Sequence, residues 1–417
     1  MTETCLIDTL GPLAVVQPQD IAELSNAVCA AAGRDEAIYP IGGKTMLAYG
    51  LPPIKPGIAV DTGRLDRVID YPARDMTVTV QAGITLAKLQ AVLGKENQRL
   101  PIDVPLAERA TLGGVLATNA SGPRRYGFGT ARDYVIGISV MNDQGEEAKA
   151  GGRVVKNVAG YDLCKLYIGS LGTLGIITQV TLKLKPRPEE QALLTLPCSD
   201  AALEAVLDRL HGSRTRPICL DLLNRATVQY INQQIDNALP DSPWVVAIGF
   251  EDNRPAVEWQ VQEVTRELAD AGWSGIHLRQ TSSAESLWRA LVEFPAWPGG
   301  RLTFKTNLPP HACAAFCRQA AASYEPLLLQ AHAGNGIVIG QSDDHLTFEA
   351  AKVLMGTLQA AASNVHGNLV ILRCPAEWKA VLPVWGCPRQ DGWLMHAVKQ
   401  RLDPGRLFNP GRFVDGI

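Results

Sequence analysis

The chain has 417 residues, of which 46% are hydrophobic and 19% charged, and its 39 basic and 42 acidic residues give a formal net charge of −3. This length excludes a miniprotein and leaves room for two or three domains of roughly 100–200 residues, each with its own core. The near-neutral charge argues against a nucleic-acid partner, because binding to a phosphate backbone needs a basic face.

No apolar run approaches the ~18–20 residues that cross a membrane, and the longest candidates, YVIGISVM and WVVAIGF, have the length of strands. The first residues, MTETCLIDTLG, lack the basic start and apolar stretch of a signal peptide. The nine cysteines are scattered and odd in number, which is typical of a reducing compartment. We therefore expect a cytoplasmic protein, soluble or peripheral to a membrane.

The first part of the chain alternates helical and strand patterns, which predicts an α/β domain. Helices are predicted over 20–33 and from 86 to 93, strands at 37–41, 58–61, 76–80 and 176–185, and a hairpin around the NDQG turn at 142–145. Between them, residues 111–131 are rich in glycine and small side chains, which lets the backbone approach something closely. The KPRP sequence at 185–188 is the best domain boundary in the chain.

Beyond this boundary the pattern predicts an α+β layer, with helices on an antiparallel or mixed sheet. Helices are predicted over 200–211, over 255–271 and from Pro309, and strands near 217–222, 244–250 and 301–308. Asn335-Gly336 between two apolar runs is a strong hairpin signal. The last stretch, 396–413, is predicted as a short helix closed by two Pro-Gly turns, and we expect it to pack back on the first domain.

Metal and nucleotide motifs of the common kinds are absent. No CxxC pair occurs, so an iron–sulfur cluster ligated by this chain alone is not expected. His311, Cys313 and Cys317 could form a metal site, but their place on a predicted helix favours buried thiols beside a surface imidazole. Neither GxGxxG at a strand–helix turn nor GxxxxGK[ST] is present.

The first part instead has four separated loops of small residues: PIGGKTML (40–47), QAGIT (81–85), TLGGVLATNASGPRRYGFG (111–129) and GSLGTLGII (169–177). Such loops could converge on one extended ligand and offer backbone N–H groups to a diphosphate. Ordinary turns between short strands would have the same composition, so the loops alone leave both interpretations open.

These loops, together with KNVAGYDLCKLYIGSLGTLGIIT and the terminal DPGRLFNPGRF, resemble the FAD-binding domain of the vanillyl-alcohol-oxidase (PCMH-type) flavoprotein superfamily. The resemblance covers residues 10–187 and 400–413, and within the superfamily the chain is similar to the E-type FAD-binding subunits of bacterial glycolate oxidases. It implies an α+β fold with a two-subdomain FAD-binding domain (1–187), an α+β cap domain (188–395) and a C-terminal segment (396–417) that returns to the FAD domain.

The resemblance implies non-covalent FAD, because Lys44 and Thr45 stand where many relatives have a histidine bonded to the flavin. It places the diphosphate against Gly42 and Gly43. The cofactor-binding residues that it implies are Pro40, Ile41, Gly42, Gly43, Lys44, Thr45, Gly83, Thr111, Leu112, Gly113, Gly114, Thr118, Asn119, Ser121, Gly122, Gly169, Gly172, Thr173, Gly175, Ile176, Ile177 and Asn409.

Catalytic relatives carry a cap motif that resembles HxGDGNxH, whose histidines hold a metal. This chain has HAGNGIVI at 332–339, with Asn335, Ile337 and Ile339 in place of the acid, the asparagine and the second histidine. A family-type metal site is therefore not expected. His332 remains a candidate base, although a strand histidine before a hairpin is the plainer interpretation.

A substrate carboxylate needs a cation, and the cap segment RLTFKTNLPP offers Arg301 and Lys305, which a period-2 strand would place on one face. Arg124 and Arg125 are further candidates, and Tyr126 or Tyr161 could abut a flavin ring. In each case a solvent-facing or merely structural side chain is the alternative.

The resemblance implies a subunit of a glycolate oxidase or dehydrogenase complex that oxidises glycolate, a 2-hydroxy acid, to glyoxylate. We expect this chain to support electron transfer beside a second FAD-containing subunit that performs the oxidation. An iron–sulfur subunit would pass electrons toward the membrane, so peripheral association at the inner face of the plasma membrane would come only through the complex. The alternative is a stand-alone FAD-dependent oxidoreductase acting on another hydroxy acid or a lactone.

Overall fold

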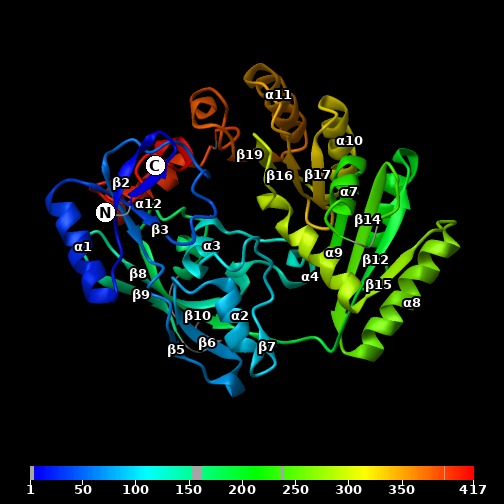
Figure 1. Cartoon of the computed structure of the whole chain (residues 1–417), viewed down its shortest axis with the longest axis horizontal. Coiled ribbons are helices and arrows are strands. Elements are labelled where there is room, and N and C mark those ends of the chain that lie inside the picture. The colour runs from blue at the N-terminus through cyan, green and yellow to red at the C-terminus, as the bar shows by residue number, and fades with distance from the viewer. Residues whose placement is uncertain (1–3, 153–161, 236–238, 389) are drawn as a thin grey trace.

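The computed structural model describes residues 4–152, 162–235, 239–388 and 390–417. The fold is a mixed α+β fold, as predicted, and its N-terminal half and its large C-terminal sheet lie side by side in Figure 1. Among the described residues, no helix combines the length and the apolar character needed to cross a bilayer.

The first sheet contains the N-terminal strands and packs against helix α1 (Ile21–Gly33). Its strands, in spatial order, are β1 (Thr4–Ile7), β2 (Leu10–Val16), β4 (Gly57–Asp61) and β3 (Ala37–Ile41). Helix α1 (Ile21–Gly33) begins where the side chain of Asp20 accepts a hydrogen bond from the backbone N–H of Glu23 at 2.9 Å. Leu24 and Val28 of this helix are fully buried beside Ile38 and Val60 of the sheet, so the predicted helical face is the core face.

The second sheet and its connections carry three of the four glycine-rich segments, while PIGGKTML begins at the end of β3 of the first sheet. Its strands are β5 (Val68–Asp70), β6 (Thr77–Gln81), β10 (Ile176–Lys183), β8 (Val135–Met141) and β9 (Glu147–Gly151), and its helices are α2 (Leu86–Gly94), α3 (Leu112–Thr118), α4 (Arg125–Phe128) and α5 (Cys164–Tyr167). Helix α3 was not predicted, because its glycines mask the helical spacing of its three buried side chains. β7 (Gln98–Arg99) pairs with β11 (Lys185–Pro186), which anchors the KPRP segment.

An eight-stranded antiparallel sheet forms most of the second half. Its strands, in spatial order, are β15 (His277–Gln280), β12 (Glu190–Cys198), β14 (Trp244–Asp252), β13 (Cys219–Asn224), β17 (Leu328–His332), β18 (Ile337–Gln341), β16 (Thr303–Asn307) and β19 (Asn368–Arg373). β17 and β18 form the hairpin that Asn335-Gly336 predicts, with Gly336 at φ +73°. This sheet places Lys305 and His332 on one of its faces.

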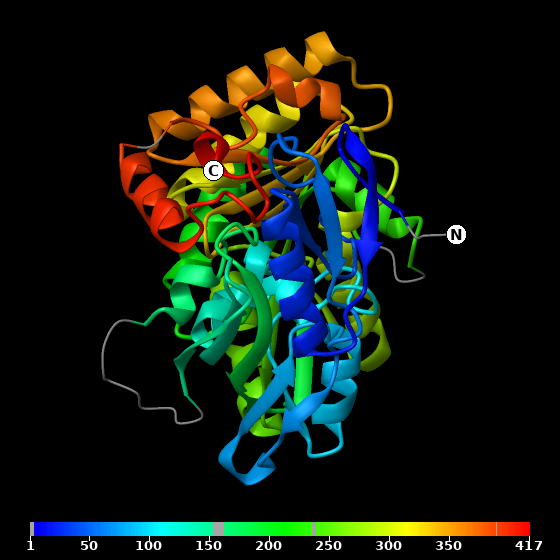
Figure 2. The same ribbon diagram turned by 90° about the vertical axis from the view of Figure 1, so that its left-hand side faces the viewer.

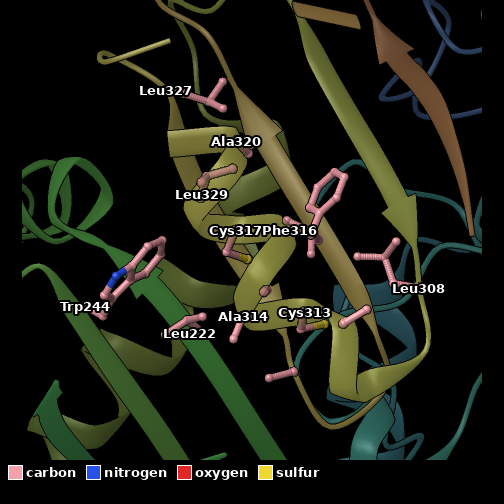
Figure 3. Close-up of a cluster of buried hydrophobic side chains, with 14 of the residues drawn as sticks. Leu222, Trp244, Leu308, Cys313, Ala314, Phe316, Cys317, Ala320, Leu327 and Leu329 are labelled. Atoms are coloured by element: carbon pink, nitrogen blue, oxygen red, sulfur yellow. The ribbon is translucent and has the colours of Figure 1, made fainter. Parts of the chain in front are cut away.

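Helices cover both faces of this sheet. The larger core lies under α6 (Leu203–His211), α8 (Arg254–Asp270), α10 (Cys313–Ser323) and α11 (Phe348–Asn364), and the smaller under α7 (Arg225–Asn232) and α9 (Thr281–Glu293). Cys313 and Cys317 point from α10 into the larger core, among apolar side chains (Figure 3). Burial raises the pKa of Cys313 to about 12, so this thiol is held in its neutral form.

The C-terminal segment lies against the first sheet, where Figures 1 and 2 both show it in red beside the blue strands. After α12 (Gly392–Leu402), Phe408 forms a bridge with Ile38 of β3, and Arg412 donates to the backbone oxygen of Tyr49 at 2.6 Å. The buried ammonium of Lys399 donates to Asp403 at 2.6 Å and to the oxygen of Thr173 at 2.7 Å. These contacts attach the last residues to the loops that the sequence assigns to the cofactor.

Buried ionic contacts join the cap to the rest of the chain, and they include an ion pair of 2.6 Å between Arg99 and Glu251. Lys379 donates to Asp8 at 2.7 Å, and Arg124 lies 2.6 Å from both Asp103 and Glu251. Because a buried ion pair tolerates little displacement, these contacts fix the large sheet over the glycine-rich loops.

Candidate functional site

A cavity of about 280 Å³ lies between the glycine-rich loops and the large sheet. One side consists of the loop after β3, the segment around α3, the loop before β10 and the C-terminal Asn409 and Arg412. The opposite side consists of residues from β16, β18 and β19 with the turn at Pro295 and Ala296. Segments from both ends of the chain therefore meet at one site.

The PIGGKT loop forms one end of the cavity, and residues 40–45 all line it. A Cβ at Gly42 would lie 2.2 Å from Oγ1 of Thr111, and one at Gly43 would lie 1.8 Å from the backbone oxygen of Arg109. Only glycine therefore allows this loop to pack on the α3 segment. Lys44 has φ +57° and its ammonium lies 4.0 Å from the carboxylate of Asp61.

The α3 segment supplies Thr111, Gly113, Gly114, Thr118, Asn119 and Ser121 to the cavity wall. A Cβ at Gly113 would meet Ala82 at 3.1 Å, whereas one at Gly114 would meet Oγ1 of Thr111 alone, at 3.2 Å. Gly114 therefore presents bare backbone to the cavity. The side-chain oxygen of Asn119 is buried and has no hydrogen-bond partner among the described residues, so a ligand in the cavity could supply its donor.

The third predicted loop contributes Gly172, Gly175, Ile176 and Ile177. Asn409 holds this loop from the C-terminal segment, because its side-chain amide donates to the backbone oxygen of Leu171 at 2.6 Å. A Cβ at Gly172 would lie 3.2 Å from that same amide nitrogen.

Five of the predicted cofactor residues do not line the cavity: Gly83, Leu112, Gly122, Gly169 and Thr173. Leu112 is buried in the core of the second sheet. Gly83 and Gly122 allow close packing on Thr62 and Asp103, and the hydroxyl of Thr173 donates to the backbone oxygen of Ser170. In the structure these residues shape the loops that line the cavity.

The cap contributes one of its two predicted cations. Lys305 lines the cavity, and no ion pair or hydrogen bond to it is found among the described residues. Burial, together with the positive charge of Arg125, lowers the pKa of Lys305 to about 8. Arg301 precedes the strand, which begins at Thr303, so strand alternation does not place it beside Lys305 as expected. Its guanidinium lies over the ring of Trp378 and donates to the backbone oxygen of Leu346, away from the cavity.

His332 is buried in the sheet and does not line the cavity. Its Nδ1 lies 2.8 Å from a carboxylate oxygen of Asp221, whose other oxygen accepts a hydrogen bond from Gln330 at 2.6 Å. Its Nε2 has no partner among the described residues. Ile337, its neighbour across β18, lines the cavity instead.

Two arginines at the cavity were missed from the sequence. Arg373, at the end of β19, donates to Trp297 and Thr303, and its Nε is buried without a partner among the described residues. The Nε of Arg412 is also buried and unpartnered within this part of the chain. Burial lowers the pKa of both groups. Arg412 could have been found from the sequence, because it lies in the NPGRF motif with the predicted Asn409. Nothing in NLVILR indicates that Arg373 belongs to a site.

The remaining candidates lie near the cavity or beyond the described residues. Arg125 donates to Ser121 at 3.3 Å, and Arg124 belongs to the ionic contact with the cap. The ring of Tyr126 packs where a Cβ of Gly334 would lie. Tyr161 and the preceding part of its motif lie outside the described residues.

The lining of the cavity suits a dinucleotide such as FAD. Its walls are bare backbone where Gly42, Gly43, Gly114 and Gly172 lie, and buried polar atoms without partners face it from both sides. A ligand rich in phosphate, hydroxyl and ring nitrogen atoms can satisfy such groups. Fold and cavity together define a flavoprotein with a cofactor-binding part and a separate cap.

Comparison with known proteins supports this class. Residues 12–151 match the family described as "FAD binding domain", and residues 185–379 match "FAD linked oxidases, C-terminal domain". The glycolate oxidase subunit GlcD of Bacillus subtilis (strain 168) is 34% identical, over 96% of this chain and 88% of that protein. The chain belongs to the family of FAD-linked oxidases, and it binds FAD.

Two further similarities concern the subunit type and the fold. The glycolate oxidase subunit GlcE of Escherichia coli (strain K12) is 39% identical over 122 residues, which is 29% of this chain and 35% of that protein. The structure of p-cresol methylhydroxylase with substrate bound has a TM-score of 0.74 against this chain, with 16% identity over 98% of this chain and 91% of that one. The family is established, whereas the predicted identity as the E-type subunit of a glycolate oxidase is not.

Proposed function

We propose that this chain itself oxidises 2-hydroxy acids with FAD, as part of a complex of the glycolate oxidase type. This differs from the expectation drawn from the sequence, in which this chain supports electron transfer and a second FAD-containing subunit performs the oxidation. The observation that carries the proposal is Lys305, a half-buried cation that lines the cavity beneath the cap sheet and whose pKa desolvation lowers. A buried cation without an acidic partner is costly, and a substrate carboxylate would offset that cost.

Arg373 strengthens this anion site. It lies opposite Thr303 on the neighbouring strand, two residues along from Lys305, and burial lowers its pKa as well. Two cations then lie at one end of the cap wall, where they would hold the carboxylate and orient the adjacent carbon toward the cofactor. Bound FAD supplies the acceptor for the two electrons that leave the C–OH group.

The rest of the cap wall would exclude water from the reacting carbon. Ile337, Ile339 and Leu372 line it, and Pro295 and Ala296 close the adjoining turn. An apolar wall strengthens the attraction between a carboxylate and Lys305, because it lowers the local dielectric constant. His332 takes no part in this proposal, since it is buried and does not line the cavity.

We further propose that electrons leave through partner subunits. HAGNGIVI lacks two ligand-type residues of the metal motif, and the nine cysteines are all free thiols, seven of them buried. Two relatives are named as subunits of glycolate oxidase, which supports assembly into a complex. The partners that we propose, a second FAD-containing subunit and an iron–sulfur subunit, are those implied by the resemblance of the sequence. The chain would meet the inner face of the plasma membrane only through them.

Anaerobic addition of glycolate and other 2-hydroxy acids to the FAD-loaded chain tests the proposal. We expect bleaching of the oxidised flavin spectrum, and faster reduction of an added dye when candidate partner subunits are present. Full turnover without any partner would favour a stand-alone oxidoreductase, acting on a hydroxy acid or a lactone. A flavin that no 2-hydroxy acid reduces, with or without partners, would contradict the proposal.

A further inference from the structure

The cap wall of the cavity is polar at one end and apolar at the other. Thr303 and Arg373 are paired across β16 and β19, and Lys305 lies two residues further along β16 on the same face. Ile339 of β18 is directly opposite Lys305, and Ile337 lies two residues further along β18, away from Thr303 and Arg373. The charged side chains of Arg373 and Lys305 therefore lie toward one end of the wall, and the wall is apolar toward Ile337.

The strand register fixes where a bound carboxylate would direct the rest of its molecule. Lys305 is directly opposite Ile339, and side chains in such a pair have Cβ atoms about 4.5–5.5 Å apart. Ile337 lies two residues from Ile339 and lines the cavity with it. A carboxylate held between Lys305 and Arg373 therefore leaves its next carbons only these two isoleucines to contact on β18.

No polar side chain interrupts this apolar stretch among the described residues of β17 and β18 that line the cavity. Gln330 and His332 share the face, but they are buried, form hydrogen bonds with Asp221 and do not line the cavity, whereas their partners Ile339 and Ile337 do. Gln341 is also buried, and its amide donates to the backbone oxygen of Phe294. A second charge or hydroxyl on the substrate would find no partner here.

We infer that the substrate is a 2-hydroxy monocarboxylate with an aliphatic side chain of several carbons, and that Ile337 and Ile339 determine this specificity. The inference rests on the proposed function and names the substrate class of the same site. Glycolate has no side chain to cover the two isoleucines. A dicarboxylate such as 2-hydroxyglutarate would bring its second charge against them.

The test separates binding from oxidation. Acetate, butanoate, hexanoate and glutarate are titrated into the oxidised FAD-loaded protein, and the shift of the flavin spectrum reports binding of these non-oxidisable acids. We expect the dissociation constant to fall about fourfold for each added methylene from acetate to hexanoate, as for apolar burial. Glutarate should bind more weakly than hexanoate. The matching 2-hydroxy acids are then compared as reductants of the flavin, each enantiomer separately.

Polar variants that keep the branch at Cβ locate the effect. Ile337→Thr and Ile339→Thr should flatten the series to about twofold or less for each methylene. Ile371→Thr is the matched control, because Ile371 is opposite Phe304 and faces the larger core, away from the cavity. It should leave the slope unchanged. The native series decides the substrate class even if a variant fails to fold.

The two proposals fail in different ways. A flat series, or tighter binding of acetate or glutarate than of hexanoate, would overturn the inference while flavin reduction by any 2-hydroxy acid upheld the proposed function. A rising series with no reduction by any 2-hydroxy acid would refute the redox proposal but support aliphatic carboxylate recognition. An unchanged slope in both cavity variants would remove the specificity role from Ile337 and Ile339.

Discussion

Lys305 on β16 and Ile339 on β18 lie directly opposite each other, and both line the cavity beneath the cap sheet. Lys305 therefore lies beside a hydrocarbon side chain that can neither accept a hydrogen bond nor form an ion pair. The positive charge of Arg125 makes the protonated form of Lys305 still less favourable. This arrangement favours the binding of an anion, because a carboxylate that enters the cavity would replace the interactions with water that the ammonium lost on burial.

Carboxylate binding should weaken as the pH rises through about 8. The pKa of Lys305 is lowered to about 8, so below this pH the amine is charged and binds an anion, and above it the free protein must take up a proton first. We expect the dissociation constant of hexanoate to be constant below pH 7 and to rise about tenfold per unit above pH 8. Spectral titration from pH 6 to 9.5 measures it, and a constant value across this range would contradict the assignment.

The lowered pKa of Lys305 also makes the stability of the fold depend on pH. In the unfolded chain this lysine keeps its proton up to its ordinary pKa of 10.5, whereas in the folded protein it loses the proton near 8. Between these values the unfolded state binds more protons, so the contribution of Lys305 to the free energy of unfolding rises with pH. A comparison with Lys305→Met in denaturant at pH 7.5 and 9.5 isolates this contribution.

Gly114→Val should abolish flavin retention and leave the chain folded. The new Cβ would meet only the Thr111 hydroxyl, so the branched side chain would occupy the cavity rather than the core. Gly113→Val should also lose flavin, but it presses on Ala82 and is expected to cost stability as well. Gly356→Val, on an exposed face of α11 with nothing near its Cβ, is the control. Normal flavin content in both loop variants would show that this loop does not hold the cofactor.

His332→Ala should affect stability more than chemistry. Removing the imidazole takes one hydrogen-bond partner from the buried carboxylate of Asp221, which we expect to lower the free energy of unfolding by about 1–3 kcal/mol. The rate of dye reduction by the complex with a 2-hydroxy acid should fall by less than about tenfold, whereas loss of a general base typically costs ~10²–10⁴-fold. A loss beyond about a hundredfold with FAD still bound would make His332 a catalytic residue.

The FAD should come off the protein on denaturation. The PIGGKT loop has Lys44 and Thr45 where a covalently bonded histidine would stand, and residues 40–45 line the cavity without any histidine. Acid precipitation should therefore leave the yellow colour in the supernatant. Colour that remains with the washed pellet would show covalent attachment.

Much of the fold follows from local sequence patterns. The Asp20 cap and the apolar spacing after it define α1, and Asn335-Gly336 defines the β17–β18 hairpin, because each signal lies within a few neighbouring residues. The loops around Gly42, Gly114 and Gly172 were also predictable, since their motifs occur in a characteristic order. Their convergence on one cavity depends on the order of strands in the two small sheets, which no single segment encodes.

The cap side of the site was less predictable for a physical reason. Arg301 and Lys305 have the spacing of one strand face, but the strand begins at Thr303, and the ring of Trp378 holds Arg301 on the other side. Arg373 comes to the cavity only because β19 pairs with β16 across nearly 70 residues of chain. Such contacts are set by tertiary pairing, which overrides local periodicity.

The central claim is that this cavity oxidises a 2-hydroxy acid whose carboxylate binds Lys305. It is tested most directly by the anaerobic half-reaction of native protein, Lys305→Met and the exposed control Lys352→Met, each loaded with FAD, in which the rate of flavin bleaching is measured against 2-hydroxy-acid concentration. We predict saturable bleaching in the native protein and the control, and at least about 30-fold weaker apparent binding in Lys305→Met, the effect of removing one partner of a buried charge pair. Equal concentration dependence in Lys305→Met and native protein, with FAD bound in both, would contradict the account.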